Sequence, residues 1–330
     1  MKSILQYMLM GFFPILFFSC NNDLDLIDDY KETPVIYGLL SLSDDTQYVR
    51  VQKAFLGEGN ALLMAQYSDS IYYDTTFIKI NLEETVNGSI TRNIPMMMDG
   101  TQQKDEGLFI NSPHLIYRTD SLQLNKDARY KLIFNNAKTG KTVTGSTPIV
   151  GRVLTPIALA FPFINLSSPN PLDIKINSAA NAKIYGLNVV FNYAEKKTTN
   201  PINNYVYKSI NYVFPEVVNN NQGIHFYMQP SDFFSFIGSH IPIDTSLTRP
   251  AIFTSMDFVF TTGAEDFFIY YSVNQPSLSL AQNIPDFTNL SDGKGLFSSR
   301  NKNMFNNIKF NNASTDSLIN GQFTRGRFLN

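Results

Sequence analysis

The sequence predicts a mainly β protein built from two β-sandwich-like domains, with one or two short helices. Short runs in which apolar and polar residues alternate fill most of the chain, and few stretches have the spacing of an amphipathic helix. The composition agrees, because Phe and Tyr favour strands and the frequent Asn residues favour turns. A length of 330 residues is sufficient for two domains.

The first twenty residues predict export rather than folded structure. Lys2 is the only charged residue before Cys20, and residues 4–18 are almost continuously apolar. This run is shorter than the roughly 20 residues that a membrane-spanning helix needs. Phe17, Phe18 and Ser19 then precede Cys20 and resemble the lipobox of bacterial lipoproteins, although Phe17 stands where Leu is usual.

The lipobox resemblance implies a signal peptide over residues 1–19 and a diacylglycerol on Cys20. The alternative is an ordinary signal peptide with a chance cysteine. Cys20 is the only cysteine of the chain, and exported proteins normally pair their cysteines or have none, which favours lipidation. Two or three acyl chains would hold the protein stably on a membrane, whereas one chain would hold it only marginally.

Residues 20–32 are predicted to form an acidic tether, with Asp at positions 23, 25, 28 and 29. Acidic residues directly after the lipidated cysteine resemble the surface-export signals of Bacteroidota lipoproteins, and a plain solvated linker is the alternative. We therefore expect a lipid-anchored protein of the outer membrane, on its cell-surface or its periplasmic face.

The first folded domain is predicted over residues 33–150. Expected strands cover residues 35–40 and 48–55, and a short helix over residues 60–66 is capped by Asn60. Asn87-Gly88 predicts a hairpin between residues 77–82 and 89–96. Residues 137–140 predict a second hairpin, between residues 130–134 and 142–146. Several short strands with regular turns indicate a sandwich of immunoglobulin-like or transthyretin-like type.

The second domain is predicted over residues 151–330, with longer strands at residues 184–193 and 205–214. A third hairpin is expected between residues 253–260 and 267–273. A helix is expected to start at Ser231 or Asp232, with Phe233, Phe236 and Ile237 on one apolar face. Residues 274–300 are expected to form an ordered, turn-rich loop.

Three segments carry a resemblance to a known group of proteins. Residues 34–40 (PVIYGLL), 48–61 (YVRVQKAFLGEGNA) and 287–297 (FTNLSDGKGLF) resemble an uncharacterised family of Bacteroidota outer-membrane lipoproteins with β-sandwich domains, a domain of unknown function. The resemblance implies a β-sandwich lipoprotein of the outer membrane and, as an expectation, association with a TonB-dependent transporter. It implies no reaction, and no functional residue is carried over.

The residues give little indication of catalysis or of metal binding. A net charge of −2 without a long basic block argues against nucleic-acid binding. The three histidines, His114, His225 and His240, lack the spacing of a zinc site. No nucleophile, base and orienting group can be assembled from the sequence, so we expect no enzymatic activity, no catalytic residues, no metal and no cofactor.

Two kinds of candidate site remain. Gly57, Glu58, Gly59 and Asn60 could form a binding loop, although a structural corner between a strand and a short helix explains the same residues. Four Asp-Ser/Thr triplets resemble the O-glycosylation sites of exported Bacteroidota proteins and make candidates of Ser70, Thr75, Ser121 and Ser317.

The leading hypothesis is a non-enzymatic binding or accessory protein of the cell envelope. Its expected partners are the membrane, through the lipid, and an outer-membrane transporter or another envelope protein. The alternative is a glycan-binding or adhesion module, in which Tyr72-Tyr73 or Tyr270-Tyr271 would replace the absent Trp as an aromatic platform. A hydrolase is the remote alternative.

Overall fold

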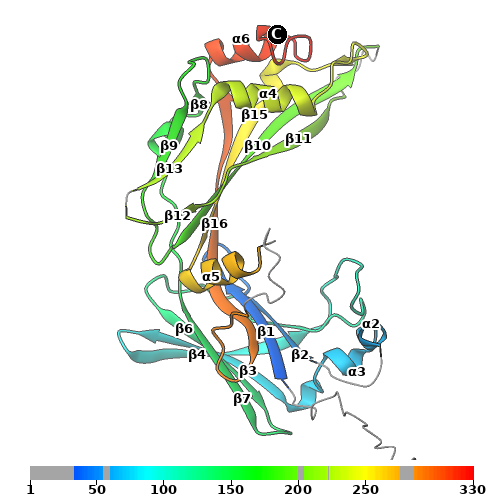
Figure 1. The fold of residues 1–330 in the computed structure, drawn as a ribbon, viewed down its shortest axis with the longest axis vertical. Coiled ribbons are helices and arrows are strands. Elements are labelled where there is room, and N and C mark those ends of the chain that lie inside the picture. Colours follow the sequence, from blue (N-terminus) through cyan, green and yellow to red (C-terminus); the bar gives the residue numbers. More distant parts are fainter. Residues whose placement is uncertain (1–32, 55–59, 200–203, 222, 276–285) are drawn as a thin grey trace, which may run out of the picture.

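The computed structural model describes residues 33–54, 60–199, 204–221, 223–275 and 286–330. The chain is mainly β, as predicted. Its strands form one 14-stranded mixed sheet and one two-stranded sheet. Figure 1 shows an elongated molecule with two lobes that meet at a narrow waist. The first lobe contains β1 to β7, and the second contains β8 to β15 with α4 and α6. The long strand β16 belongs to both.

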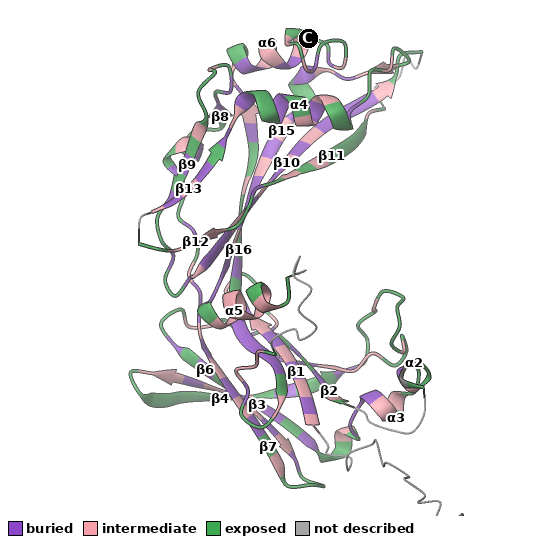
Figure 2. Cartoon of the chain, in the orientation of Figure 1, coloured by how far each residue is buried: buried purple, intermediate pink, exposed green. Residues whose placement is uncertain are grey.

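The first lobe is a sandwich of short strands around its own core. Its strands are β1 (Thr33–Leu40), β2 (Tyr48–Ala54), β3 (Ile78–Val86), β4 (Ser89–Asp99), β5 (Ile116–Arg118), β6 (Arg129–Asn136) and β7 (Lys141–Pro148). Its helical turns are α2 (Ala61–Met64), α3 (Ser68–Ile71) and η1 (Thr75–Phe77). In the burial view, buried residues alternate with intermediate or exposed ones along β1 and β6 (Figure 2).

Both predicted hairpins of this lobe are confirmed. β3 and β4 join through Asn87 and Gly88, whose φ angles of 49° and 82° are those of a tight hairpin turn. β6 and β7 pair from Asn136 opposite Lys141, and Gly140 has a φ of 70° in their turn. Local turn chemistry therefore sets the register of these four strands.

A buried carboxylate sits between these hairpins. Glu84 is 3% exposed, and its carboxylate accepts hydrogen bonds from Arg92, from the Tyr130 hydroxyl and from Thr91 Oγ1, the last at 2.7 Å. The Arg92 bond lowers the pKa of Glu84, burial opposes that effect, and the bonds from Tyr130 and Thr91 lower the pKa further, to about 2. The ionised form of Glu84 therefore stabilises the folded chain.

Acid should remove this contribution in a defined window. The stability from Glu84 is fully present above its ordinary pKa of 4.5, and it is lost as the pH falls from there to about 2. We expect the free energy of unfolding in urea to fall more steeply between pH 5 and about 3 in the natural chain than in Glu84→Gln. Parallel curves for the two proteins would show that Glu84 is not the responsible group.

The second lobe packs two layers around an aromatic core. Its strands are β8 (Phe163–Ile164), β9 (Leu172–Ile176), β10 (Ile184–Lys197), β11 (Val206–Val213), β12 (Val217–Val218), β13 (Ile224–Met228), β14 (Leu247–Thr248), β15 (Ser255–Gly263) and the end of β16 (Lys294–Phe310). Its helices are α4 (Pro230–His240), α5 (Glu265–Val273), α6 (Asn312–Asn320) and the turns η2 (Ile157–Leu159) and η3 (Ala251–Phe253). Phe191 lies at the core centre, with the rings of Phe233, Phe310 and Phe328 within 6.2 Å of its own.

The predicted strand over residues 267–273 is wrong, because this segment forms α5. Glu265 and Asp266 occupy the first turn, where acidic side chains favour a helix start. The following residues are apolar on every side, and such a run has neither the strand nor the helix period. The predicted cap of α4 also shifts, because the helix starts at Pro230 after Gln229 rather than at Ser231 or Asp232.

The loop predicted over residues 274–300 is wrong at its end, since β16 begins at Lys294. The prediction of turns here depended on Gly293 and Gly295. Gly295 instead lies inside the strand with a φ of 104°, and a Cβ there would lie 2.1 Å from the Ile36 carbonyl oxygen. Glycine at this position therefore permits close approach of two strands rather than a turn.

β16 joins the two lobes without a break. Its first part pairs in parallel with β1, from Lys294 opposite Val35 to Ser299 opposite Leu40. Its next part pairs antiparallel with β15, from Arg300 opposite Gly263. Membership of the two buried clusters changes between Ile149 and Val150, but Leu290 and Phe297 belong to the first-lobe core. The exact domain boundary stays a prediction, since one strand serves both cores.

Candidate functional site

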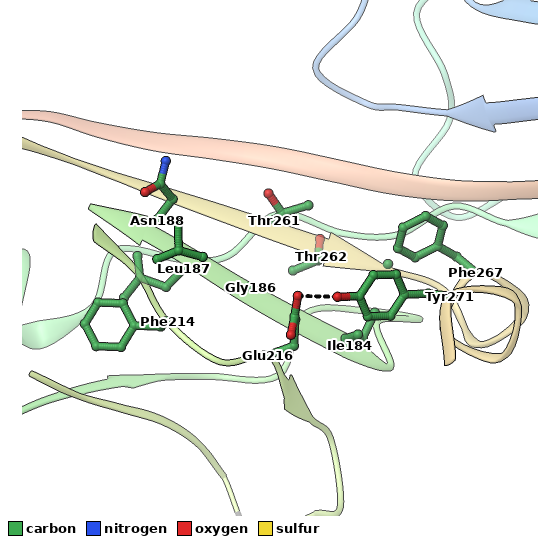
Figure 3. A pocket seen from close by; sticks show the side chains of 12 residues that line it. Ile184, Gly186, Leu187, Asn188, Phe214, Glu216, Thr261, Thr262, Phe267 and Tyr271 are labelled. Atoms are coloured by element: carbon green, nitrogen blue, oxygen red, sulfur yellow. Dashed lines mark hydrogen bonds between the residues drawn. The ribbon is translucent and has the colours of Figure 1, made fainter. Parts of the chain in front are cut away.

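A small pocket lies beside the waist, where α5 meets the sheet of the second lobe (Figure 3). Its volume is about 250 Å³. Strands β10 and β15 form its floor, residues 213–216 form one side, and α5 forms another. The lining residues are Ile184, Gly186, Leu187, Asn188, Val213, Phe214, Glu216, Thr261, Thr262, Gly263, Phe267 and Tyr271.

Two glycines shape the floor in different ways. A Cβ on Gly263 would lie 2.4 Å from Phe267 Cδ1, so the missing side chain lets α5 pack against the sheet. A Cβ on Gly186 would have only the Thr261 Cβ within reach, at 4.0 Å. The space above Gly186 is therefore open, and this missing side chain is what leaves the floor hollow.

The wall consists of two aromatic rings one helical turn apart. Phe267 and Tyr271 stack with centroids 6.3 Å apart and planes 16° apart. Tyr270, which directly precedes Tyr271 in the chain, points to the first lobe, and its hydroxyl donates to Tyr37 Oη on β1 at 3.3 Å. Burial and this hydrogen bond raise the pKa of Tyr37 to about 12, so the Tyr37 hydroxyl stays protonated at neutral pH. Helix α5 therefore touches both lobes.

The pocket has one carboxylate, and one buried oxygen among its lining residues has no hydrogen-bond partner. Glu216 accepts from the Tyr271 hydroxyl at 2.6 Å, and this bond raises the pKa of Tyr271. None of the salt bridges among the described residues includes Glu216. Asn188 uses its Nδ2 to donate to Asn211 at 3.3 Å, while its buried Oδ1 has no hydrogen-bond partner. An unpaired buried oxygen is costly and calls for an explanation.

The predicted lipidation site and most of the predicted binding loop lie outside the described residues. This holds for Cys20 and for Gly57, Glu58 and Gly59 of the candidate binding loop. Asn60 is described and exposed, and its Oδ1 accepts from the Leu62 amide at 2.9 Å. Asn60 therefore caps α2 as predicted, and its side chain has a structural role there.

The four O-glycosylation candidates lie in different surroundings. Ser121 is exposed in a bend, whereas Ser70, Thr75 and Ser317 are half-buried. Ser70 lies in α3 and Thr75 begins η1. Ser317 lies within α6, where its hydroxyl donates to the Ala313 carbonyl at 3.1 Å. Modification of all four stays a prediction, and Ser121 has the most accessible hydroxyl.

The aromatic pairs proposed for glycan binding separate in the structure. Tyr72 and Tyr73 are 5% and 9% exposed, so a platform at this pair is wrong. The Tyr270 hydroxyl is hydrogen-bonded to Tyr37, and Tyr271 lines the waist pocket. Glu216, Asn188 and Gly186 carry no sequence motif. The one available signal was Gly186 within an otherwise regular strand, because such a glycine often marks an open space or a close approach.

The histidines assemble no catalytic group among the described residues. His225 Nδ1 lies 2.9 Å from Asp173. His240 Nδ1 lies 3.0 Å from Ser239 Oγ, but both groups also bond the Phe236 carbonyl at the end of α4, as at a helix terminus. No cluster of three metal-ligating side chains occurs in the described ranges. None of the helices in these ranges is long and apolar enough to cross a bilayer.

Comparisons with known proteins add little. No known protein-family model matches the chain, and no curated protein matches it. Among solved structures, a chain of a cytokine receptor complex is similar over 69% of this chain and 90% of its own length, with 7% identity and a TM-score of 0.18. A similarity this low carries no information about function.

Proposed function

We propose that this chain is a non-enzymatic binding protein of the cell envelope, held on the outer membrane by lipid on Cys20, and that the waist pocket is its ligand site. The observation that carries the proposal is the pocket itself, a preformed hollow with an aromatic wall and one carboxylate. Such a combination of apolar walls with a few polar groups is typical of ligand sites.

The composition of the pocket favours binding over catalysis. Glu216 is its one carboxylate, and its described lining residues include no His, Cys, Lys or Ser. General bases are most often His, and activated nucleophiles are most often Ser, Cys or Lys, and none of these residue types is among the described lining residues. The only partner of Glu216 among the lining residues is a tyrosine that donates to it.

The expected anchor and the pocket lie in different parts of the molecule. β1 begins at Thr33, directly after the predicted tether, so the lipid would be attached to the first lobe. The pocket lies beyond it, against the second lobe (Figure 1). This arrangement leaves the pocket available to an envelope partner such as an outer-membrane transporter, which is the association that the family resemblance implies.

One experiment on whole cells tests the proposal. The full chain is expressed with a labelled fatty acid, intact cells are treated with protease, and the protein is captured with an antibody from detergent-extracted envelopes. We expect lipid label on the natural chain and on Gly186→Val, and none on Cys20→Ala. Gly186→Val is expected to fold, because the new side chain enters open space, yet to lose the bound partner or ligand.

The outcomes separate the parts of the proposal. Unchanged labelling of Cys20→Ala would contradict lipidation. Equal recovery of partners by the natural chain and by Gly186→Val would contradict the pocket as the site. Protection from protease on intact cells would place the protein on the periplasmic face, and partners would then be sought there.

Glycan binding is the second candidate, and Tyr271 is the observation that favours it. With Phe267 it forms an aromatic wall beside a carboxylate, and sugars are commonly held by such a combination of ring stacking and hydrogen bonds. Retention of the natural chain, but not of Gly186→Val, on immobilised glycans would favour this candidate.

A further inference from the structure

The polar groups of the waist pocket differ from those of a general binding site, because its fixed donors are already used. The Tyr271 hydroxyl donates to Glu216, and the Asn188 amide donates to Asn211. The Thr262 hydroxyl donates to the Gly151 carbonyl at 3.4 Å. The Thr261 hydroxyl can act either way. The pocket therefore offers a ligand mainly acceptors, one of them a carboxylate.

We propose that the waist pocket binds an alkylammonium group, with the ammonium on Glu216 and its apolar stem against Phe267 and Tyr271. This inference rests on the proposed function and names the ligand class of the same site. Glu216 has no cationic partner among the described salt bridges, so an incoming ammonium would supply the missing charge. Aromatic rings next to a carboxylate favour cations, because their π faces carry partial negative charge.

Asn188 does not take part in the recognition of the ammonium group. Figure 3 shows Asn188 at the end of the pocket away from Glu216 and Tyr271. A sugar would bring donors but would also bring acceptors, for which the pocket has few free donors.

The size of the pocket limits the ligand to a short chain. A volume of about 250 Å³ lies below the range of about 300–1,000 Å³ that drug-sized ligands need. The side chain of a lysine, or a small free amine, has the right size. Both sources share the alkylammonium chemistry, and a probe can separate them.

The test measures dissociation constants by ligand-observed NMR on the purified full-length lipoprotein in detergent. The probes are n-butylammonium, the neutral n-butanol, glucose and Nα-acetyl-lysine methylamide. The variants are Glu216→Gln, which removes the charge but keeps an acceptor for Tyr271, and Gly186→Val, which fills the floor. Glu106→Gln is the matched control, since Glu106 is exposed on the first lobe.

We expect the natural chain to bind n-butylammonium up to about fivefold more tightly than n-butanol, because only the ammonium pairs with the exposed Glu216 carboxylate. Glu216→Gln should remove that preference. Gly186→Val should weaken the binding of both n-butylammonium and n-butanol, and Glu106→Gln should leave both affinities unchanged. Binding of the lysine derivative as tightly as the amine would identify a partner's lysine side chain as the source. Much weaker binding of it would identify a free amine.

Contrary results separate this inference from the proposed function. Equal affinity for n-butylammonium and n-butanol, or no effect of Glu216→Gln, would overturn the cation assignment and leave the pocket as a site. Binding of glucose that Gly186→Val abolishes would replace the cation by a glycan. Absence of binding by every probe, together with unchanged partner capture by Gly186→Val, would contradict both proposals.

Discussion

Arg249→Met is expected to lower the free energy of unfolding by about 3 kcal/mol, because it leaves a buried carboxylate short of its main partner. Arg249 is 3% exposed, its Nε donates to Glu195 Oε2 at 2.8 Å, and its Nη1 donates to the Pro242 carbonyl at 3.0 Å. Burial raises the pKa of Glu195, but hydrogen bonds from Lys208 and Arg249 outweigh it, so the pKa falls below its usual value. Glu195 is therefore ionised inside the second lobe.

Lys208→Met provides the matched control. Lys208 bonds the other oxygen of Glu195, but its side chain is 49% exposed. Exposed ion pairs contribute about 1 kcal/mol or less, so this variant should remain close to the natural chain in stability. Urea denaturation of the three proteins, followed by circular dichroism, compares the two losses. Equal losses for both variants would show that burial of Arg249 is not what makes its ion pair important.

Gly295→Ala is expected to lower the free energy of unfolding by about 2–4 kcal/mol, since the alanine Cβ has no room and the backbone angle is unfavourable. The added carbon would lie 2.1 Å from the Ile36 carbonyl oxygen, with a φ of 104°. Relief requires separation of β1 from β16, so amide protons between these strands should exchange faster with solvent.

Gly186→Ala is the control for this second variant, because its Cβ would meet only Thr261 at 4.0 Å and its φ carries no strain. We expect its stability to stay within about 1 kcal/mol of the natural chain. Hydrogen exchange measured by mass spectrometry on both variants checks the location of the effect. Fast exchange confined to the second lobe in Gly295→Ala would contradict the assigned role of this glycine.

The strands that the sequence predicted well are those with local signals. Asn87-Gly88 and the turn ending at Gly140 identify their hairpins because the required backbone angles depend on a few neighbouring residues. The mainly β class follows from the same alternation. Helix α5 and strand β16 were missed for a different reason. The apolar run of α5 has neither the strand nor the helix period, so its pattern does not indicate the element. The need for glycine at position 295 comes from its close approach to Ile36, which lies far away in the sequence.

The waist pocket could not be predicted from local patterns. Three separate segments of the chain contribute Gly186, Glu216 and Tyr271 to the pocket, and the sequence around each of them contains no motif. Tyr271 was a candidate only as half of a tyrosine pair. In the structure, Tyr270 contacts the first lobe and Tyr271 lines the pocket. Such a site depends on tertiary packing, which a single sequence does not display.

The position of β16 also sets an order of events during folding. The first lobe needs Leu290 and Phe297 for its core, and these residues follow nearly all of the second lobe along the chain. While the chain is synthesised from its N-terminus, β1 has no neighbour on its β16 side, and the first lobe cannot close. The first-made half of the protein is therefore completed last. The edge of β1 would therefore need protection by a chaperone for the longest time.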